Sequence, residues 1–342
     1  MKYPKPLKAG STIAITAFSQ GIGPEHEPRF ALVCANLKAM GFNIVVGKCL
    51  RGQAKQVSAP AAERANELMA FLLDDSIDAI YPPWGGELAI ELLPRLDFEK
   101  LKQAKPKWIL GFSDVSTVAV ALCCKLGWAS VHCSNLMDLV DASDDPLTRN
   151  TLKHLSCETG AEFTQSQSKM HTHAWPDFVS KPEAGYVYTS PSKWRWLTQP
   201  KTGGTIDGRL IGGCWDVLKH LFGTQYLDLE SLASRYPEGI ILYLENAEMS
   251  PAELARTIVS MKMRSVFDSI NALVLGRSAV SDSDLEDDLR YLDVLQGHLS
   301  ELKIPILIDV DIGHVPPNLT LINGAFARFE LASEALVAQH LI

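Results

Sequence analysis

The feature that most constrains the fold is the alternation of short apolar segments with helix-like segments in the N-terminal part of the chain. Residues 12–16, 43–46, 77–81 and 108–110 have the pattern of buried strands, and residues 28–40, 60–73 and 115–122 have that of helices. Strands this apolar are buried on both faces, which predicts a parallel sheet covered by helices. In such sheets ligands bind beyond the carboxyl ends of the strands.

The chain has 342 residues, which is more than one hydrophobic core usually organises, so we expect two domains. We place an N-terminal domain at residues 1–165 and a C-terminal α/β domain at residues 166–342. The second domain has strand-like segments at 240–244, 272–275 and 306–308, and an acidic helical segment at 281–298. Alternating residues on either side of Asn323-Gly324 predict a terminal antiparallel hairpin.

Charge and cysteine usage exclude several classes of protein. The formal net charge is −8, so we expect no nucleic-acid polymer and no membrane surface as a partner. The seven cysteines form no Cys-x-x-Cys pair and their number is odd, which favours a reducing compartment over a disulfide framework. The sequence has no signal-like apolar segment and no apolar run of membrane length, so we expect a cytoplasmic protein.

The sequence Gly111-Phe112-Ser113-Asp114 lies between the fourth predicted strand and the helix that follows it. A serine on a tight strand-to-helix turn projects its hydroxyl beyond the sheet, where the next backbone N–H can bind an oxyanion. The G-x-S-x-G pattern is incomplete, because Val115 occupies the place of its second glycine. The alternative is that Ser-Asp simply caps the helix.

Two further polar residues follow predicted strands of the second domain. Glu245 ends the apolar run 240–244, and His314 lies in the loop after the strand at 306–308. Each has an ordinary alternative, a capping or solvated acid for Glu245 and an incidental histidine for His314. Together with Ser113, however, they have the chemistry of acyl transfer, in which histidine takes the serine proton and the carboxylate orients the histidine.

Gly85-Gly86 follows the third predicted strand. Two glycines allow backbone N–H groups to approach a substrate oxygen without obstruction by a Cβ atom. We therefore predict an oxyanion hole formed by Gly86 and Asp114, the alternative being a simple turn. The pair is not part of a phosphate-binding motif, because neither G-x-G-x-x-G nor G-x-x-x-x-G-K-[ST] occurs.

These motifs resemble the LD-carboxypeptidase and microcin C immunity family of serine peptidases. The similarity covers nearly the whole chain, and the matching segments are residues 6–15, 41–47, 63–69, 78–80, 85–86, 92–98, 111–114, 208–213, 223–224, 244–248 and 313–318. No single segment is specific for the family, but the set is.

The resemblance implies a flavodoxin-like N-terminal domain that carries Ser113 and a smaller β-rich α/β domain that carries Glu245 and His314. It places the active site in the cleft between them, with the Gly86 and Asp114 backbone as oxyanion hole. It also implies a homodimer and an activity that requires no metal or other cofactor.

The chain departs from the family pattern at positions that face the substrate. Glu87 follows the two glycines where many members have tyrosine, and Cys214 follows Gly212-Gly213 where the family has asparagine. Gly85, Glu87, Trp194 and Trp196 are therefore predicted to contact the substrate. For the two tryptophans the alternative is a place in the hydrophobic core.

Three functions remain open from the sequence. The first is a carboxypeptidase of peptidoglycan recycling that removes a terminal D-residue from a small murein peptide. The second has the same catalytic residues but cleaves peptidyl- or aminoacyl-nucleotides, as microcin immunity proteins do, with aromatic residues of the segment 186–196 stacking on the base. The third is a non-catalytic α/β ligand-binding protein, in which Ser113, Glu245 and His314 would not converge.

Overall fold

The N-terminal half is a parallel sheet in the order predicted for a flavodoxin-like domain. The computed structural model describes residues 1–140, 144–201, 203–285, 287–332 and 334–342. Its first sheet has the order β2-β1-β3-β4, and a parallel bridge between Leu110 and Val131 adds β5. The order 2-1-3-4-5 is that of flavodoxin-like folds. The strands are β1 (Thr12–Ile15), β2 (Asn43–Val46), β3 (Ala79–Ile80), β4 (Trp108–Ile109) and β5 (Ser130–His132).

Helices cover both faces of the central strands of this sheet, as the apolar strands predict. The predicted burial of residues 43–46 is wrong, because β2 is the edge strand and its Val45 and Val46 are 39% and 42% exposed. Helix α1 packs in one hydrophobic cluster, with Ile13 and Ile15 of β1, whereas α2 and α4 pack in another, with Ala14 on the opposite face. The helices are α1 (Glu27–Ala39), α2 (Ala61–Leu73), α3 (Phe98–Leu101) and α4 (Val115–Leu126), with 3-10 turns η1 (Pro24–His26), η2 (Lys48–Leu50), η3 (Ala89–Arg95) and η4 (Leu136–Asp138). The predicted α/β class is confirmed.

The C-terminal half is built on an eight-stranded mixed sheet in the order β6-β16-β15-β10-β11-β12-β13-β9. Strands β10 to β13 are parallel; β15 pairs antiparallel with β10, and β9 pairs antiparallel with β13. Strands β16 and β6 continue the sheet beyond β15 in antiparallel pairs. The strands are β6 (Glu162–Ser166), β9 (Arg195–Thr198), β10 (Thr205–Cys214), β11 (Ile240–Glu245), β12 (Ala272–Gly276), β13 (Ile306–Val310), β15 (Phe326–Leu331) and β16 (Ala335–His340). The expected β-rich α/β second half is therefore confirmed.

Short helices and one small ribbon complete the C-terminal half. The helices of this part are α7 (Trp215–Leu218), α8 (Leu229–Arg235), α9 (Pro251–Met263), η5 (Val266–Ser269) and α10 (Tyr291–Leu299). Helices α5 (Pro146–Arg149) and α6 (Thr151–His154) precede them in the chain, and Leu152 of α6 packs in the cluster of β1 and α1. Strands β7 (Met170–His171) and β8 (Ser190–Pro191) pair with each other. The helix expected at 281–298 begins only at Tyr291, where the Asp293 carboxylate caps the first turn.

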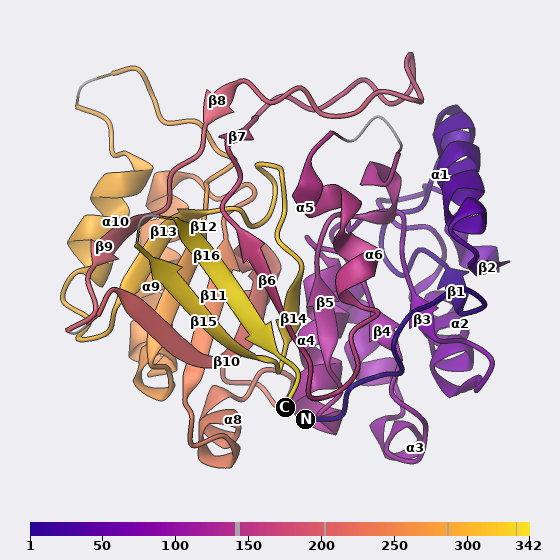
Figure 1. The fold of residues 1–342 in the computed structure, drawn as a ribbon, viewed down its shortest axis with the longest axis horizontal. Coiled ribbons are helices and arrows are strands. Elements are labelled where there is room, and N and C mark those ends of the chain that lie inside the picture. The colour runs from indigo at the N-terminus through magenta and orange to yellow at the C-terminus, as the bar shows by residue number, and fades with distance from the viewer. Residues whose placement is uncertain (141–143, 202, 286, 333) are drawn as a thin grey trace.

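The expected terminal hairpin around Asn323-Gly324 is not formed. Strand β14 (Leu321–Asn323) instead pairs with β5 of the N-terminal half, and β15 pairs with β10 and β16. The Asn323 side chain stabilises this arrangement, because its oxygen accepts hydrogen bonds from Gly212 N and the Tyr243 hydroxyl while its nitrogen donates to Ser130 Oγ. Figure 1 shows β14 beside β5, at the junction of the two halves.

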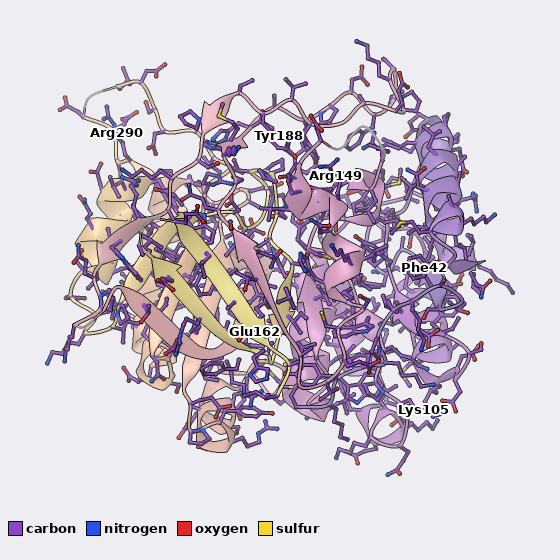
Figure 2. All side chains as sticks on the ribbon, viewed as in Figure 1. Phe42, Lys105, Arg149, Glu162, Tyr188 and Arg290 are labelled. Atoms are coloured by element: carbon purple, nitrogen blue, oxygen red, sulfur yellow. The ribbon has the colours of Figure 1, made fainter. Side chains whose placement is uncertain are left out.

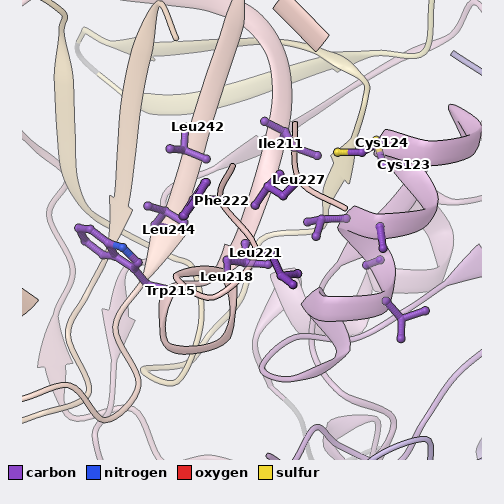
Figure 3. Packing of buried hydrophobic residues seen from close by; sticks show 14 of the residues in the cluster. Cys123, Cys124, Ile211, Trp215, Leu218, Leu221, Phe222, Leu227, Leu242 and Leu244 are labelled. Carbon is purple, nitrogen blue, oxygen red and sulfur yellow. The ribbon is translucent and has the colours of Figure 1, made fainter. Parts of the chain in front are cut away.

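The two halves share one hydrophobic core. Helix α4 packs against β10 and α7, and Leu122 and Cys123 belong to the same buried cluster as Ile211 and Leu218 (Figure 3). The division at residues 165 and 166 stays a prediction; β6 at that point pairs with β16 of the second sheet. Within the described residues, no helix is both long and apolar enough to span a bilayer.

Candidate active site

Ser113 lies on a strained turn between β4 and α4. Its φ angle is +63°, in the left-handed region that non-glycine residues rarely adopt, and Gly111 has a φ of +132°. A Cβ atom on Gly111 would lie 2.8 Å from Asn135 Oδ1, which accepts a hydrogen bond from Phe112 N. Strain of this kind persists only where surrounding contacts enforce it, and it is common at nucleophile turns.

The Asp114 side chain anchors this turn rather than capping the helix. Its carboxylate is buried and accepts hydrogen bonds from Ser19 Oγ at 2.6 Å, Ala89 N at 2.8 Å and Thr117 Oγ1 at 2.9 Å. Burial raises the pKa of Asp114, although these hydrogen bonds oppose the rise. The carboxylate therefore fixes the serine turn to the loop after β3.

That loop brings Gly85 and Gly86 to the serine. A Cβ atom on Gly85 would lie 2.7 Å from Asp114 N and 2.9 Å from Ser113 Oγ, so only glycine fits there. Gly86 has a φ of +141°, and a Cβ atom on it would lie 2.5 Å from Ser19 Oγ. Within the described part of the chain, no acceptor receives the backbone N–H of Gly86 or Asp114. The Asp114 N–H thus follows Ser113 directly, and the Gly86 N–H follows Gly85, which contacts Ser113; their role as oxyanion donors stays a prediction.

Glu245 and His314 meet Ser113 from the other half of the molecule. His314 Nδ1 lies 2.8 Å from Glu245 Oε2, and His314 Nε2 lies 3.0 Å from Ser113 Oγ. Because an ionised carboxylate only accepts hydrogen bonds, Nδ1 carries the proton and Nε2 accepts one from the serine hydroxyl. Ser113, Glu245 and His314 therefore converge, which would not be expected of a non-catalytic binding protein.

Glycines leave room for the Glu245 side chain. Glu245 ends β11 and is 0% exposed, and a Cβ atom on Gly313 would collide with its carboxyl group. A Cβ atom on Gly276 would lie 2.9 Å from Glu245 Cβ. Gly313 N donates to Asn318 Oδ1, which shapes the loop that carries His314.

Acidic side chains set the electrostatics around His314. Burial acts to lower the pKa of His314, but the negative charge of Glu245, assisted by Asp216 and Glu248, outweighs it and raises the pKa above its ordinary value. The exposed Glu87 is part of the same acidic surroundings. Partial burial raises the pKa of its carboxyl group, and Glu248, Asp114 and Asp216 raise it further. This region favours cationic groups.

A second set of contacts, which sequence reasoning missed, holds the His314 loop. Asp311 is fully buried and binds the Arg277 guanidinium at 2.5 Å, Ser168 N at 2.9 Å and Trp194 Nε1 at 2.9 Å. The only sequence signal for Asp311 was its place three residues before His314. Nothing in the linear sequence associates it with Arg277 or Ser168.

Ser116 connects the two halves near the site, and Asp216 shapes the C-terminal side of it. Ser116 Oγ, one turn into α4, accepts a hydrogen bond from Cys214 N at 3.1 Å. Cys214 is paired in register with Glu245 across β10 and β11. Asp216 accepts backbone hydrogen bonds from residues 247, 248 and 249, which shapes the turn after Glu245. These contacts set the distance between serine and carboxylate.

The two tryptophans expected to contact the substrate both pack against the core of the C-terminal half. Trp194 is 2% exposed and packs against Phe329, and Trp196 is half-buried and packs against the same cluster. The two residues are two positions apart at the edge strand β9, so their side chains lie on the same face, which packs against this cluster. The burial of Trp194 favours the core alternative for that residue, whereas a substrate contact of the partly exposed Trp196 stays a prediction.

Other aromatic residues lie on the segment between β7 and β8. This segment extends from the C-terminal half toward α1 of the N-terminal half (Figure 1). Trp175 is 47% exposed and its ring centroid lies 5.5 Å from that of Tyr186, which donates a hydrogen bond to Asp138. Figure 2 labels Tyr188 on the same segment, above α5. Trp175 is the exposed aromatic ring of this group.

The fold and the converged side chains define the class of protein. A serine, a histidine and a carboxylate in hydrogen-bond sequence at the ends of strands are the arrangement of α/β serine hydrolases. Family profiles narrow the class: the LD-carboxypeptidase N-terminal domain matches residues 13–133 and the LD-carboxypeptidase C-terminal domain matches residues 207–329. The chain belongs to the LD-carboxypeptidase family of serine peptidases.

Similar proteins come from both branches of this family. The Escherichia coli microcin C7 self-immunity protein MccF is 27% identical over 341 residues, covering 93% of this chain and 90% of that protein. The Bacillus subtilis "Probable murein peptide carboxypeptidase" is 23% identical over 338 residues, covering 98% and 94%. The structure of MccF with glutamyl sulfamoyl guanosine superposes with a TM-score of 0.84 at 23% identity, covering 98% of both chains. That likeness confirms the fold.

Proposed function

We propose that this protein is a serine carboxypeptidase that hydrolyses the amide bond to a terminal D-amino acid in a small murein-type peptide. The observation that carries the proposal is the continuous hydrogen-bond path from Glu245 through His314 to Ser113, with contacts of 2.8 and 3.0 Å. A serine hydroxyl is a weak nucleophile until a base removes its proton. The path supplies that base and orients it.

The residues support a two-stage reaction. His314 Nε2 accepts the Ser113 proton while Oγ attacks the carbonyl carbon of the scissile amide, and Glu245 stabilises the imidazolium that forms. The imidazolium then donates its Nε2 proton to the leaving amine, the C–N bond breaks and the acyl group stays on Oγ. A water molecule gives a proton to Nε2 while its oxygen attacks the carbonyl carbon of this ester. The imidazolium then returns a proton to Oγ as the ester C–O bond breaks, which releases the carboxylic acid and restores the Ser113 hydroxyl.

The oxyanion of the tetrahedral intermediates is assigned to the N–H groups of Gly86 and Asp114. They lie on a turn and a loop that the Asp114 carboxylate joins. Fixed backbone donors require no reorganisation as negative charge develops, and loss of one such donor commonly costs a factor of 100 to 1,000 in rate, an order-of-magnitude value from other enzymes.

The acidic surroundings of His314 indicate which peptides fit. Glu87, Asp216 and Glu248 all act electrostatically on this region. Two arginines from motif segments are used elsewhere: Arg209 pairs with Glu238, and Arg95 donates to the Glu91 carbonyl. A substrate with an ammonium group near the scissile bond is favoured here. A murein tetrapeptide has such a group on the diamino acid that precedes its terminal D-alanine.

A second candidate function is cleavage of an aminoacyl- or peptidyl-nucleotide by the same residues. The exposed ring of Trp175 favours it, because aromatic side chains stack on nucleobases with about 1–3 kcal/mol per base. MccF has been determined with glutamyl sulfamoyl guanosine and with aspartyl sulfamoyl adenosine. Those aminoacyl groups are acidic, whereas the surroundings of His314 here favour a cationic one.

Product analysis by mass spectrometry separates the two candidates. The protein is incubated with a murein tetrapeptide that ends in D-alanine and, separately, with aspartyl and lysyl sulfamoyl adenosine. We expect loss of D-alanine from the tetrapeptide, with no product from the Ser113→Ala variant. Cleavage of the nucleosides alone would replace the first candidate by the second.

A matched peptide series tests the role of the acidic side chains. Tetrapeptides with diaminopimelate, lysine or the neutral norleucine at the third position are compared at equal concentration. We expect norleucine to lower kcat/KM, and we expect Glu87→Gln to reduce the preference for the ammonium group. Equal rates for all three peptides would contradict this assignment while leaving the hydrolytic mechanism intact.

A further inference from the structure

Cys214 places a thiol beside the carboxylate and imidazole of the site. It ends β10 and is paired in register with Glu245 at the end of β11. One ligand atom from each of Cys214, Glu245 and His314 lies within 4.8 Å of the others. Thiolate sulfur, carboxylate oxygen and imidazole nitrogen are the three donor types that Zn²⁺ prefers.

Glu245 has a carboxylate oxygen that the hydrogen-bond path does not use. Oε2 accepts from His314 Nδ1, whereas Oε1 is buried and has no hydrogen-bond partner among the described residues. The whole residue is 0% exposed. Buried polar atoms are nearly always partnered, because an unpartnered one is destabilising by about 1–3 kcal/mol. This oxygen is therefore available as a ligand.

The surroundings of the three residues attract a cation. The Cys214 thiol makes only a weak contact, as donor to Asp216 Oδ2 at 3.8 Å. The Asp216 carboxylate itself stays in place through three backbone hydrogen bonds. Two fixed carboxylates beside the thiol, those of Glu245 and Asp216, lower the free energy of a divalent cation at this position.

We propose that Cys214, Glu245 and His314 Nδ1 form a reversible site for Zn²⁺, and that occupation of this site switches the peptidase off. The metal replaces the proton on Nδ1, so the neutral imidazole carries its one proton on Nε2. A protonated Nε2 cannot accept the proton of Ser113. The thiol gives up its proton to solvent, so one proton is released for each metal ion bound. The inhibitory part rests on the proposed function.

Direct binding measurements test the site without any substrate. Co²⁺ serves as a spectroscopic replacement for Zn²⁺, and we expect a thiolate-to-cobalt absorption band that Zn²⁺ abolishes. Zn²⁺ calorimetry in buffers of different ionisation enthalpy should report release of about one proton. Cys214→Ala should lose the band and weaken Zn²⁺ binding at least about 100-fold, the scale seen when metal sites are disturbed.

A second buried cysteine provides the control. Cys124 on α4 is 6% exposed and is not one of the three clustered residues, so Cys124→Ala should keep the band and the affinity. Absence of a thiolate band in the wild-type protein, or an equal affinity in Cys214→Ala, would overturn the proposed site.

Hydrolysis assays then test the switch. Zn²⁺ should inhibit the wild-type and Cys124→Ala proteins, a chelator should restore them, and the fraction of activity that Cys214→Ala loses on adding Zn²⁺ should be much smaller. Equal fractional inhibition of both cysteine variants would overturn the switch. A thiolate-cobalt band in a protein that hydrolyses no tested substrate would instead contradict the proposed function and leave the metal site standing.

Discussion

The two halves of the molecule supply the candidate site in different ways. The N-terminal half contributes a backbone conformation: Ser113 has a φ of +63° and lies beside glycines that leave room for it. The C-terminal half contributes a side-chain pair, Glu245 and His314, which are 69 residues apart in the chain. The first contribution is one short turn held by Ser19, Ala89 and Asn135, whereas the second depends on the packing of a whole sheet.

This difference predicts which substitutions in each half affect the site. On the nucleophile side, a single added methyl group meets the serine or the Asp114 N–H directly. On the acid and base side, the loop of His314 is fixed by buried polar contacts of Asp311 with Arg277 and Ser168. We therefore expect changes on the first side to act on the chemistry and changes on the second to act on the protonation and position of the histidine.

The largest effect is expected for Ser113→Ala, which removes the nucleophile. We expect kcat to fall by about 10⁴- to 10⁶-fold, as for other serine nucleophiles. A Ser113→Gly variant should lose as much activity as Ser113→Ala. Its free energy of unfolding should be about 1 kcal/mol higher than that of Ser113→Ala, because glycine adopts positive φ without strain. Steady-state hydrolysis and urea unfolding measure the two quantities.

Two outcomes would contradict the predictions for the Ser113 variants. Activity above a tenth of the wild-type rate in Ser113→Ala would show that another group is the nucleophile. Equal stability of the alanine and glycine variants would show that the turn is not strained in solution.

Glu245→Gln tests the other half of the site, and we expect it to lower kcat by about 10⁴-fold. The amide can place a donor group opposite Nδ1, which favours the tautomer whose Nε2 carries the proton. Hydrolysis of the same peptide measures the loss. Glu253→Gln on α9 is the control, because Glu253 pairs with Lys219 at the surface and should keep full activity. Near-wild-type activity in Glu245→Gln would remove this residue from the mechanism.

Gly85→Ala should lower kcat by about 100- to 1,000-fold, the scale of losing an oxyanion donor. The added Cβ atom would lie 2.7 Å from Asp114 N and so obstruct this donor. Gly10→Ala is the matched control, since Gly10 has a φ of +91° and open space around its Cβ position. The Gly10→Ala variant should have a lower free energy of unfolding and an unchanged kcat. Parallel kinetic and unfolding measurements on both variants distinguish obstruction of the site from backbone strain.

The smallest expected effect is a shift in pH dependence. The base is active when neutral, so kcat/KM should rise with pH as His314 loses its proton, and its raised pKa places this rise above about pH 6.5. Glu248→Gln removes a negative charge that raises this pKa, so the rise should move to lower pH by a few tenths of a unit.

A distant acid provides the comparison for the pH profile. Glu230→Gln on the exposed surface of α8 changes the net charge equally and should leave the profile in place. An equal shift in both variants would indicate a general charge effect, and a shift to higher pH in Glu248→Gln would contradict the assigned direction.

The amino-acid sequence by itself determined the first sheet and the nucleophile turn. Apolar runs such as residues 12–16 and 108–110 are local signals, because they depend on neighbouring residues along the chain. The Gly-Phe-Ser-Asp turn also has a local sequence signal, although Ser19, Ala89 and Asn135 hold its conformation. The roles of Ser113, Glu245 and His314 remain predictions that these experiments test, although their positions in the chain already suggested them.

Only the tertiary structure decided how the two halves meet. Strand β14 had the sequence of a hairpin arm, yet it pairs with β5, because Asn323 finds its hydrogen-bond partners on Gly212, Tyr243 and Ser130. The sequence around Trp194 is compatible with a substrate contact, yet in the structure its indole N–H donates a hydrogen bond to Asp311 inside the core. Partners this far apart in sequence leave no periodic signal, because their contact is created by packing of the whole chain.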